Sequence, residues 1–212
     1  MGCDIHSYAE VYHQNSWKFI KDNIFTYGYY TRGSLNWGGI NTHEPYGERN
    51  YYLFSLLADV RNYNNHITPI SIPRGVPKNI SKEVRKEIEQ WASDGHSHSY
   101  FTLKELLEIK WDEEIDEEGY VDIYSYNTYM KNGAPYSWCR GVGGVEIITE
   151  DEMKQLITNN PDISKIQKSY YCYIKWKENL KMHCDTFVNN TLYELSLLGE
   201  PENVRLIFWF DN

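Results

Sequence analysis

The stretch Val204-Arg205-Leu206-Ile207-Phe208-Trp209-Phe210 decides the fold class of this chain, because it is a nearly continuous apolar run of strand length. Such a run predicts a central strand. Residues 4–12 alternate between apolar and polar side chains, which predicts a second strand, and residues 17–20 return as its hairpin partner. Strands are therefore expected near both ends of the chain, and we expect them to pair in one sheet.

Helical patterns occupy the middle of the sequence. Apolar spacing and capping residues predict helices at 51–61, from Ser81 onward, at 103–109, after Thr149 and at about 179–198. The acidic run 112–118 predicts a solvated turn or edge before a strand at 120–126. Strands and helices do not alternate regularly, which favours an α+β fold. We expect a single domain over residues 1–212, with several packed helices and a mixed or antiparallel sheet that contains both chain ends.

Composition and charge limit the classes of function. The 212 residues are 41% hydrophobic and 24% charged, which is typical of a globular protein, and no apolar run approaches the roughly 18 residues that span a bilayer. We therefore expect no membrane partner. The net charge of −9 repels phosphate backbones and disfavours polymeric nucleic acid as a partner, whereas a local arginine pocket could still bind a small anion. No export leader is recognised, so we expect a cytoplasmic protein with four free cysteines.

The tract Asp94-Gly95-His96-Ser97-His98-Ser99 concentrates groups that hold metals, phosphates or protons. It is predicted to lie in a connection between two helices. If the protein is an enzyme, His96, His98 and Asp94 are the candidate catalytic residues, acting as acid and base. The alternative is structural, with Asp94 as a cap and the other side chains satisfying backbone groups of a tight loop.

The opening Met1-Gly2-Cys3-Asp4-Ile5-His6 repeats this combination of residue types, with Asp4 and His6 on one face of the predicted strand. Imidazole and carboxylate groups suit zinc, manganese or iron. No cofactor is expected, but if a divalent metal is present its candidate ligands are Asp4, His6, His96 and His98. No further motif such as HExxH supports a metal site.

Arginine and aromatic side chains in or next to irregular segments are candidates for holding a nucleotide, because an aromatic ring stacks on a base and a guanidinium binds a phosphate. The chain has 19 tyrosines. The candidate ligand-binding residues are His6, Arg49, Tyr51, Arg61, Arg74, His96, His98, Trp138 and Arg140. The alternative is a tyrosine-rich core and rim, with arginines that serve as surface salt-bridge partners.

Five motifs together resemble a family of bacteriophage proteins that open with the hexapeptide of residues 1–6. The other four motifs lie at residues 49–62, 73–77, 94–99 and 204–212. The resemblance implies a phage origin. Small acidic phage proteins often counter host immunity, and several unrelated families sequester or cleave the nucleotide signals of systems such as Thoeris and CBASS.

The first hypothesis is therefore a counter-defence protein of the host cytoplasm that sequesters a small nucleotide signal without turnover, either of cyclic ADP-ribose type or a cyclic dinucleotide. The alternative is a metal- or histidine-dependent phosphodiesterase that cleaves such a signal. A further alternative is an inhibitor that covers a host protein through an aromatic surface. A homo-oligomer is compatible with each of the three.

Overall fold

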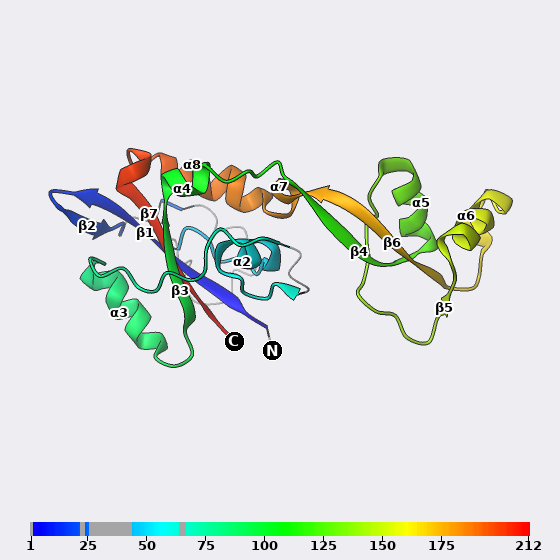
Figure 1. The fold of residues 1–212 in the computed structure, drawn as a ribbon, viewed down its shortest axis with the longest axis horizontal. Helices are drawn as coiled ribbons and strands as arrows, with labels where there is room; N and C mark the ends of the chain where they lie inside the picture. The colour runs from blue at the N-terminus through cyan, green and yellow to red at the C-terminus, as the bar shows by residue number, and fades with distance from the viewer. Residues whose placement is uncertain (1, 22–23, 26–43, 64–66) are drawn as a thin grey trace. The chain divides into compact units, whose positions relative to one another are not determined.

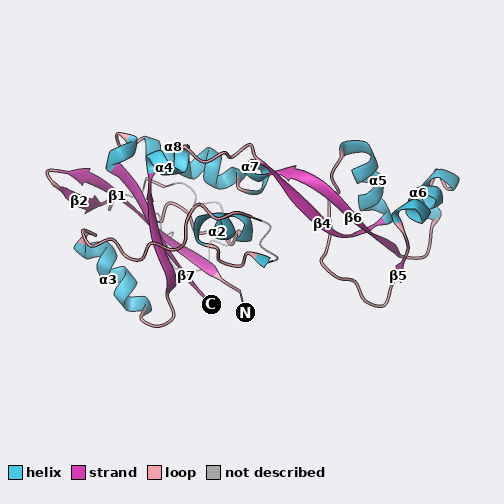
Figure 2. Cartoon of the chain, viewed as in Figure 1, coloured by secondary structure: helices cyan, strands magenta, loops and turns pink. Residues whose placement is uncertain are grey.

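The computed structural model describes residues 2–21, 24–25, 44–63 and 67–212. The chain divides into two compact units, Met1–Glu113 with Leu180–Asn212, and Glu114–Asn179 (Figure 1). Each unit combines a sheet with helices, as Figure 2 shows, so the α+β prediction is confirmed. A single domain over 1–212 stays a prediction. In the described ranges, no helix has the length and apolar character needed to cross a membrane.

The first unit is built on a four-stranded antiparallel sheet in the order β2-β1-β7-β3. Its strands are β1 (Asp4–His13), β2 (Ser16–Phe19), β3 (His96–Thr102) and β7 (Val204–Asp211). β1 and β7 pair from Asp4 opposite Asp211 to Val11 opposite Val204, which confirms that the strands near both chain ends share one sheet. β7 lies between β1 and β3, and its side chains from Val204 to Phe210 are buried on both faces of the sheet.

Short helices surround this sheet, and side-chain caps fix where several of them begin. They are α2 (Tyr51–Ala58), α3 (Lys82–Trp91), α4 (Leu103–Leu107), α7 (Leu180–His183), the π-helix η3 (Phe187–Thr191), α8 (Leu192–Ser196) and the 3-10 helix η4 (Pro201–Asn203). The predicted capping box of Thr102 and Glu105 starts α4. Asn50 caps α2, and its side chain also donates to the backbone oxygen of His183. The predicted helix at 179–198 is divided into α7, η3 and α8.

The two faces of β7 belong to different parts of the core. On one face, Trp209 and Ile207 pack with Tyr8 of β1 and with Val84 of α3. On the other face, Phe210 packs edge to face against Phe54 of α2. Because neighbouring residues of a strand point to opposite faces, Trp209 and Phe210 mark which face any nearby side chain occupies.

The second unit holds a mixed sheet in the order β4-β6-β5. Its elements are β4 (Glu114–Asp122), α5 (Ile123–Asn132), β5 (Glu146–Ile147), α6 (Glu150–Asn159), η2 (Ile163–Lys165) and β6 (Tyr170–Asn179). The acidic run therefore lies mostly within β4, because its exposed carboxylates alternate with inward-facing residues such as Ile115. The predicted strand at 120–126 is wrong beyond Asp122, where the side chain caps α5.

Candidate functional site

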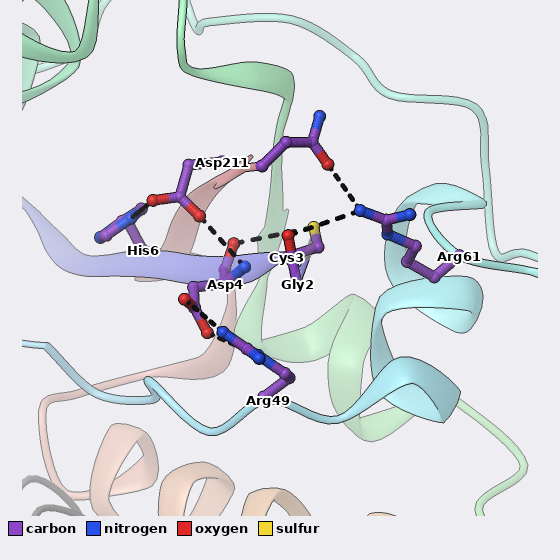
Figure 3. Close-up of polar contacts among 8 residues, drawn as sticks. Gly2, Cys3, Asp4, His6, Arg49, Arg61 and Asp211 are labelled. Carbon is purple, nitrogen blue, oxygen red and sulfur yellow. Dashed lines mark hydrogen bonds and ion pairs between the residues drawn. The ribbon is translucent and has the colours of Figure 1, made fainter.

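The candidate site lies at the end of the first sheet where β1 begins and β7 ends. The antiparallel register brings the polar residues of the opening hexapeptide beside the last residues of the chain, Asp4 opposite Asp211 and His6 opposite Trp209. Figure 3 shows the side chains of Asp4, His6 and Asp211 together with Arg49 and Arg61. Two motifs at opposite ends of the sequence thus form one polar cluster.

His6 is bracketed by two carboxylates. Its Nε2 lies 3.3 Å from Asp211 Oδ2 and its Nδ1 lies 3.6 Å from Glu44 Oε1. Its ring also packs on Trp91 at 4.0 Å and on Trp209 at 5.5 Å between centroids. Burial lowers the pKa of His6, but hydrogen bonds and charge from Glu44 and Asp211 outweigh it, so the pKa lies above its usual value. The arrangement favours the imidazolium form.

Asp4 contacts both Asp211, a partner of His6, and Arg49. Its backbone N–H donates to Asp211 Oδ1 at 3.1 Å. Its carboxylate accepts from Arg49 Nε at 2.9 Å and from Arg49 Nη2 at 2.8 Å, the bidentate geometry of a guanidinium fork (Figure 3). The side chains of Asp4 and Arg49 are 47% and 52% exposed, so this pair faces solvent.

Gly2 lies between two guanidinium groups. A Cβ at this position would be 2.4 Å from Arg49 Nη1 and 2.5 Å from Arg49 Cζ, so only glycine lets this guanidinium lie flat against the backbone. Arg61 approaches from the turn after α2, where Asp59 and Arg61 both have positive φ and reverse the chain direction. Arg61 Nη2 lies 3.5 Å from the Gly2 oxygen and 2.8 Å from Asn212 Oδ1. The cluster therefore presents two arginines at one glycine.

The structure corrects the predicted setting of the His96/His98 tract. The tract is not a connection between helices, because it begins strand β3. His96 is paired with Phe210 and Ser99 with Phe208, so the bulge between them adds one residue, and Ser97 has a φ of 51°.

Because the bulge adds one residue between them and their partner strand, His96 and His98 lie on opposite faces of the sheet. The His96 ring stacks near Phe210 and the His98 ring near Trp209, each at 6.1 Å between centroids. Burial, together with the neighbouring His96, lowers the pKa of His98. Asp94 is exposed in the preceding turn, where its N–H donates to the Trp91 oxygen. An acid-base pair built on His96 and His98 on one face is therefore not formed.

The four candidate metal ligands, Asp4, His6, His96 and His98, have different neighbours and do not all lie on one face of the sheet. His6 and His98 both contact Trp209, Asp4 binds Arg49, and His96 lies on the other face. Over the ranges that the structure describes, no three His, Cys, Asp or Glu side chains come together as a metal-binding group.

The remaining predicted ligand-binding residues are dispersed. Tyr51 is the first residue of α2 and packs on Phe54 at 5.7 Å. Arg74 pairs with Glu105 at 2.8 Å and lies over Phe101, toward the other end of β3. The other two belong to the second unit.

In that unit, Trp138 packs edge to face on Trp176 at 5.6 Å and covers Gly119. Arg140 is exposed nearby in sequence. Trp138 is thus a packing residue of the second unit. The structure brings together only His6, Arg49, Arg61 and the adjacent Tyr51 from the predicted set.

Sequence reasoning assigned no role to Gly2, Glu44 or Asp211. Asp211 had a detectable signal, because a carboxylate directly follows the apolar run of the central strand. Gly2 had only its place in the opening hexapeptide. Glu44 had no signal of its own, since its partner His6 is 38 positions away in the sequence and only the fold joins them.

Comparisons with protein-family models, with curated proteins and with solved structures gave no match.

Proposed function

We propose that this chain is a bacteriophage counter-defence protein that binds and sequesters a small nucleotide-derived immune signal, of cyclic ADP-ribose type or a cyclic dinucleotide, in the host cytoplasm. The observation that carries the proposal is the approach of Arg49 and Arg61 to the same residue, Gly2. Paired guanidinium groups are the side chains best suited to hold phosphates.

The local arrangement supports anion binding despite the net charge of −9. Arg49 donates hydrogen bonds from Nε and Nη2 to Asp4, while its Nη1 lies next to Gly2. Tyr51 follows Arg49 by two residues and interacts electrostatically with it. The Tyr63 hydroxyl accepts from Arg61 at 3.4 Å, so aromatic residues lie close to both guanidinium groups. An aromatic ring near a guanidinium is suited to a base next to a phosphate.

The bulge in β3 favours binding over turnover. A histidine-dependent phosphodiesterase built on His96 and His98 needs both rings on one side of the sheet, and their contacts with Phe210 and Trp209 separate them. The arginine pair needs no such partner, because charge and hydrogen bonds suffice to retain a ligand.

Release of bound nucleotide tests the proposal. The purified protein is incubated with cyclic dinucleotides and ADP-ribose derivatives, freed of unbound material and heat-denatured, and the released compound is identified by mass spectrometry. Intact nucleotide is expected. Arg49→Ala and Arg61→Ala should lose most of it, while Arg85→Ala, which removes an exposed arginine of α3, should retain it. Equal loss in all three variants contradicts the proposed site.

A second candidate function rests on the Glu44–His6–Asp211 arrangement. A histidine held between two carboxylates is suited to proton transfer, so a hydrolase would use His6 in place of His96 and His98. The same experiment separates the two functions: cleaved nucleotide that disappears with His6→Gln supports hydrolysis. Release of no nucleotide at all points to the remaining alternative, a host protein partner.

A further inference from the structure

Asp4 lies opposite a like charge in the sheet and beside an opposite charge at its exposed edge. Its register partner is Asp211, so two carboxylates face each other across β1 and β7. Like charges directly opposite in a sheet are destabilising. Asp211 is compensated by His6, and Asp4 is compensated by Arg49 on the exposed side. The side chains of Asp4 and Arg49 are half exposed, so a dissolved anion can reach this pair.

The carboxylate of Asp4 holds Arg49 in the way that a phosphate would. Both of its oxygens accept from the guanidinium, at 2.9 and 2.8 Å. Phosphate and carboxylate use the same fork of donors, so a ligand phosphate and Asp4 compete for Arg49. An exposed ion pair is weak enough for such an exchange.

An anion that displaces Asp4 comes to lie next to Gly2, where it can form new contacts with two arginines. Arg49 lies flat against this residue, and Arg61 Nη2 lies 3.5 Å from its oxygen. An anion that replaces Asp4 next to Gly2 can engage both arginines if it carries two neighbouring phosphates. An isolated phosphodiester carries one charge and replaces one carboxylate with one phosphate, so it gains little.

We propose that Asp4 determines the ligand specificity of this site by occupying Arg49 until a pyrophosphate group, which engages Arg49 and Arg61 together, displaces it. The inference rests on the proposed function and narrows it. It favours a ligand of ADP-ribose type, whose phosphates are adjacent, over a cyclic dinucleotide, whose two phosphodiesters are separated by sugars.

Titration calorimetry with inorganic pyrophosphate and with dimethyl phosphate, on the full chain, tests this role. Asp4→Asn removes the competing charge and keeps the side-chain size. We expect it to bind pyrophosphate about three- to tenfold more tightly than wild type and to bind dimethyl phosphate detectably, because one repulsive charge at a partly exposed site is lost. Asp4→Ser, which removes the same charge with a smaller side chain, should behave alike and guards against a folding defect in one variant.

Two matched variants separate competition from other effects. Asp4→Glu keeps the charge and should stay within about twofold of wild type, on the scale of an exposed ion pair. Asp162→Asn removes an exposed carboxylate from the second unit, with the same change of net charge, and should leave both affinities unchanged. An equal gain in Asp162→Asn overturns the inference, since net charge alone then accounts for the effect.

Different binding results overturn the role of Asp4 and the proposed sequestration of a nucleotide. If wild type binds pyrophosphate, Arg49→Ala abolishes binding and Asp4→Asn changes nothing, the role of Asp4 is overturned and the arginine site stands. If neither wild type nor Asp4→Asn binds pyrophosphate, the inference is overturned, while release of an intact cyclic dinucleotide still supports sequestration.

Discussion

At the scale of one residue, the absence of a side chain at Gly2 lets Arg49 pack directly against the backbone. The guanidinium of Arg49 occupies the place where a Cβ would be, with Nη1 and Cζ at 2.4 and 2.5 Å. Because the obstructing atoms are at the end of a flexible side chain, Gly2→Ala should displace Arg49 without unfolding the protein. We expect melting temperature to change by no more than a few degrees and binding of nucleotide to fall as far as in Arg49→Ala.

Gly141→Ala is the matched control, since no atom lies within 4 Å of a Cβ at that position. It should leave binding unchanged. A Gly2→Ala protein that retains its nucleotide would show that the contact between Arg49 and Gly2 does not contribute to the site.

At the residue scale, the contribution of His6 to the free energy of unfolding should depend on pH. Its pKa is raised in the folded state, so the folded chain binds the proton more tightly than the unfolded chain. The stabilisation is fully present below the unfolded pKa near 6.5 and is lost as pH rises through the higher folded pKa. We expect urea denaturation to show that wild type exceeds His6→Gln in stability by more at pH 5.5 than at pH 9.

Glu44 and Asp211 are the origin of this effect. Asp211→Asn should therefore reduce the pH dependence, because one of the two carboxylates that favour the imidazolium is neutralised. A pH-independent difference between wild type and His6→Gln would contradict the assigned charge state.

At the scale of elements, α6 offers a direct test of helix capping. The Thr149 hydroxyl accepts from the Glu152 N–H, and the Glu152 carboxylate accepts from the Thr149 N–H, as the capping-box spacing predicts. Thr149→Ala should lower the free energy of unfolding by about 1 kcal/mol. Thr158→Ala is the same change within the same helix, where the hydroxyl only bonds the Lys154 oxygen, and it should be nearly neutral in urea denaturation. Similar losses in the two variants would contradict the role of the cap.

The elements also show where a sequence pattern is insufficient. The sequence predicts the caps at Thr102 and Thr149, because the two partners of each capping box lie three residues apart. The sequence predicts the His96/His98 tract as a connection, yet the tract pairs with β7 and contains a bulge between His96 and Ser99. A bulge depends on the partner strand, so spacing within the tract could not reveal which face each histidine occupies.

At the scale of the whole molecule, the sheet that joins the two chain ends contains a buried ion pair. Arg205 of β7 donates from Nε to Glu10 of β1 at 2.8 Å, and both residues are almost fully buried. Removal of one partner leaves a buried charge, so Arg205→Met should lower the free energy of unfolding by about 3–5 kcal/mol. Lys104→Met breaks an exposed pair with Glu202 and should cost under about 1 kcal/mol. Chemical denaturation measures both, and equal losses would contradict the dependence on burial.

The sequence alone determined the features that depend on local patterns. The apolar run at 204–210 specified a buried strand, the alternation at 4–12 specified its partner, and spaced apolar residues specified helices, because each pattern has the period of its element. These were enough for an α+β fold with both chain ends in one sheet. Residue chemistry identified His6, Arg49, Tyr51 and Arg61 as candidates, together with Arg74, His96, His98, Trp138 and Arg140.

Only the tertiary structure decided how these residues combine. The register of β1 with β7 placed Asp4 beside Asp211, and the turn after α2 brought Arg61 to Gly2. Glu44 reached His6 in the same way, while Arg74 paired with Glu105 toward the other end of β3. The physical reason is that a site depends on contacts between residues far apart in the chain, and these are fixed by strand register and core packing rather than by any local period.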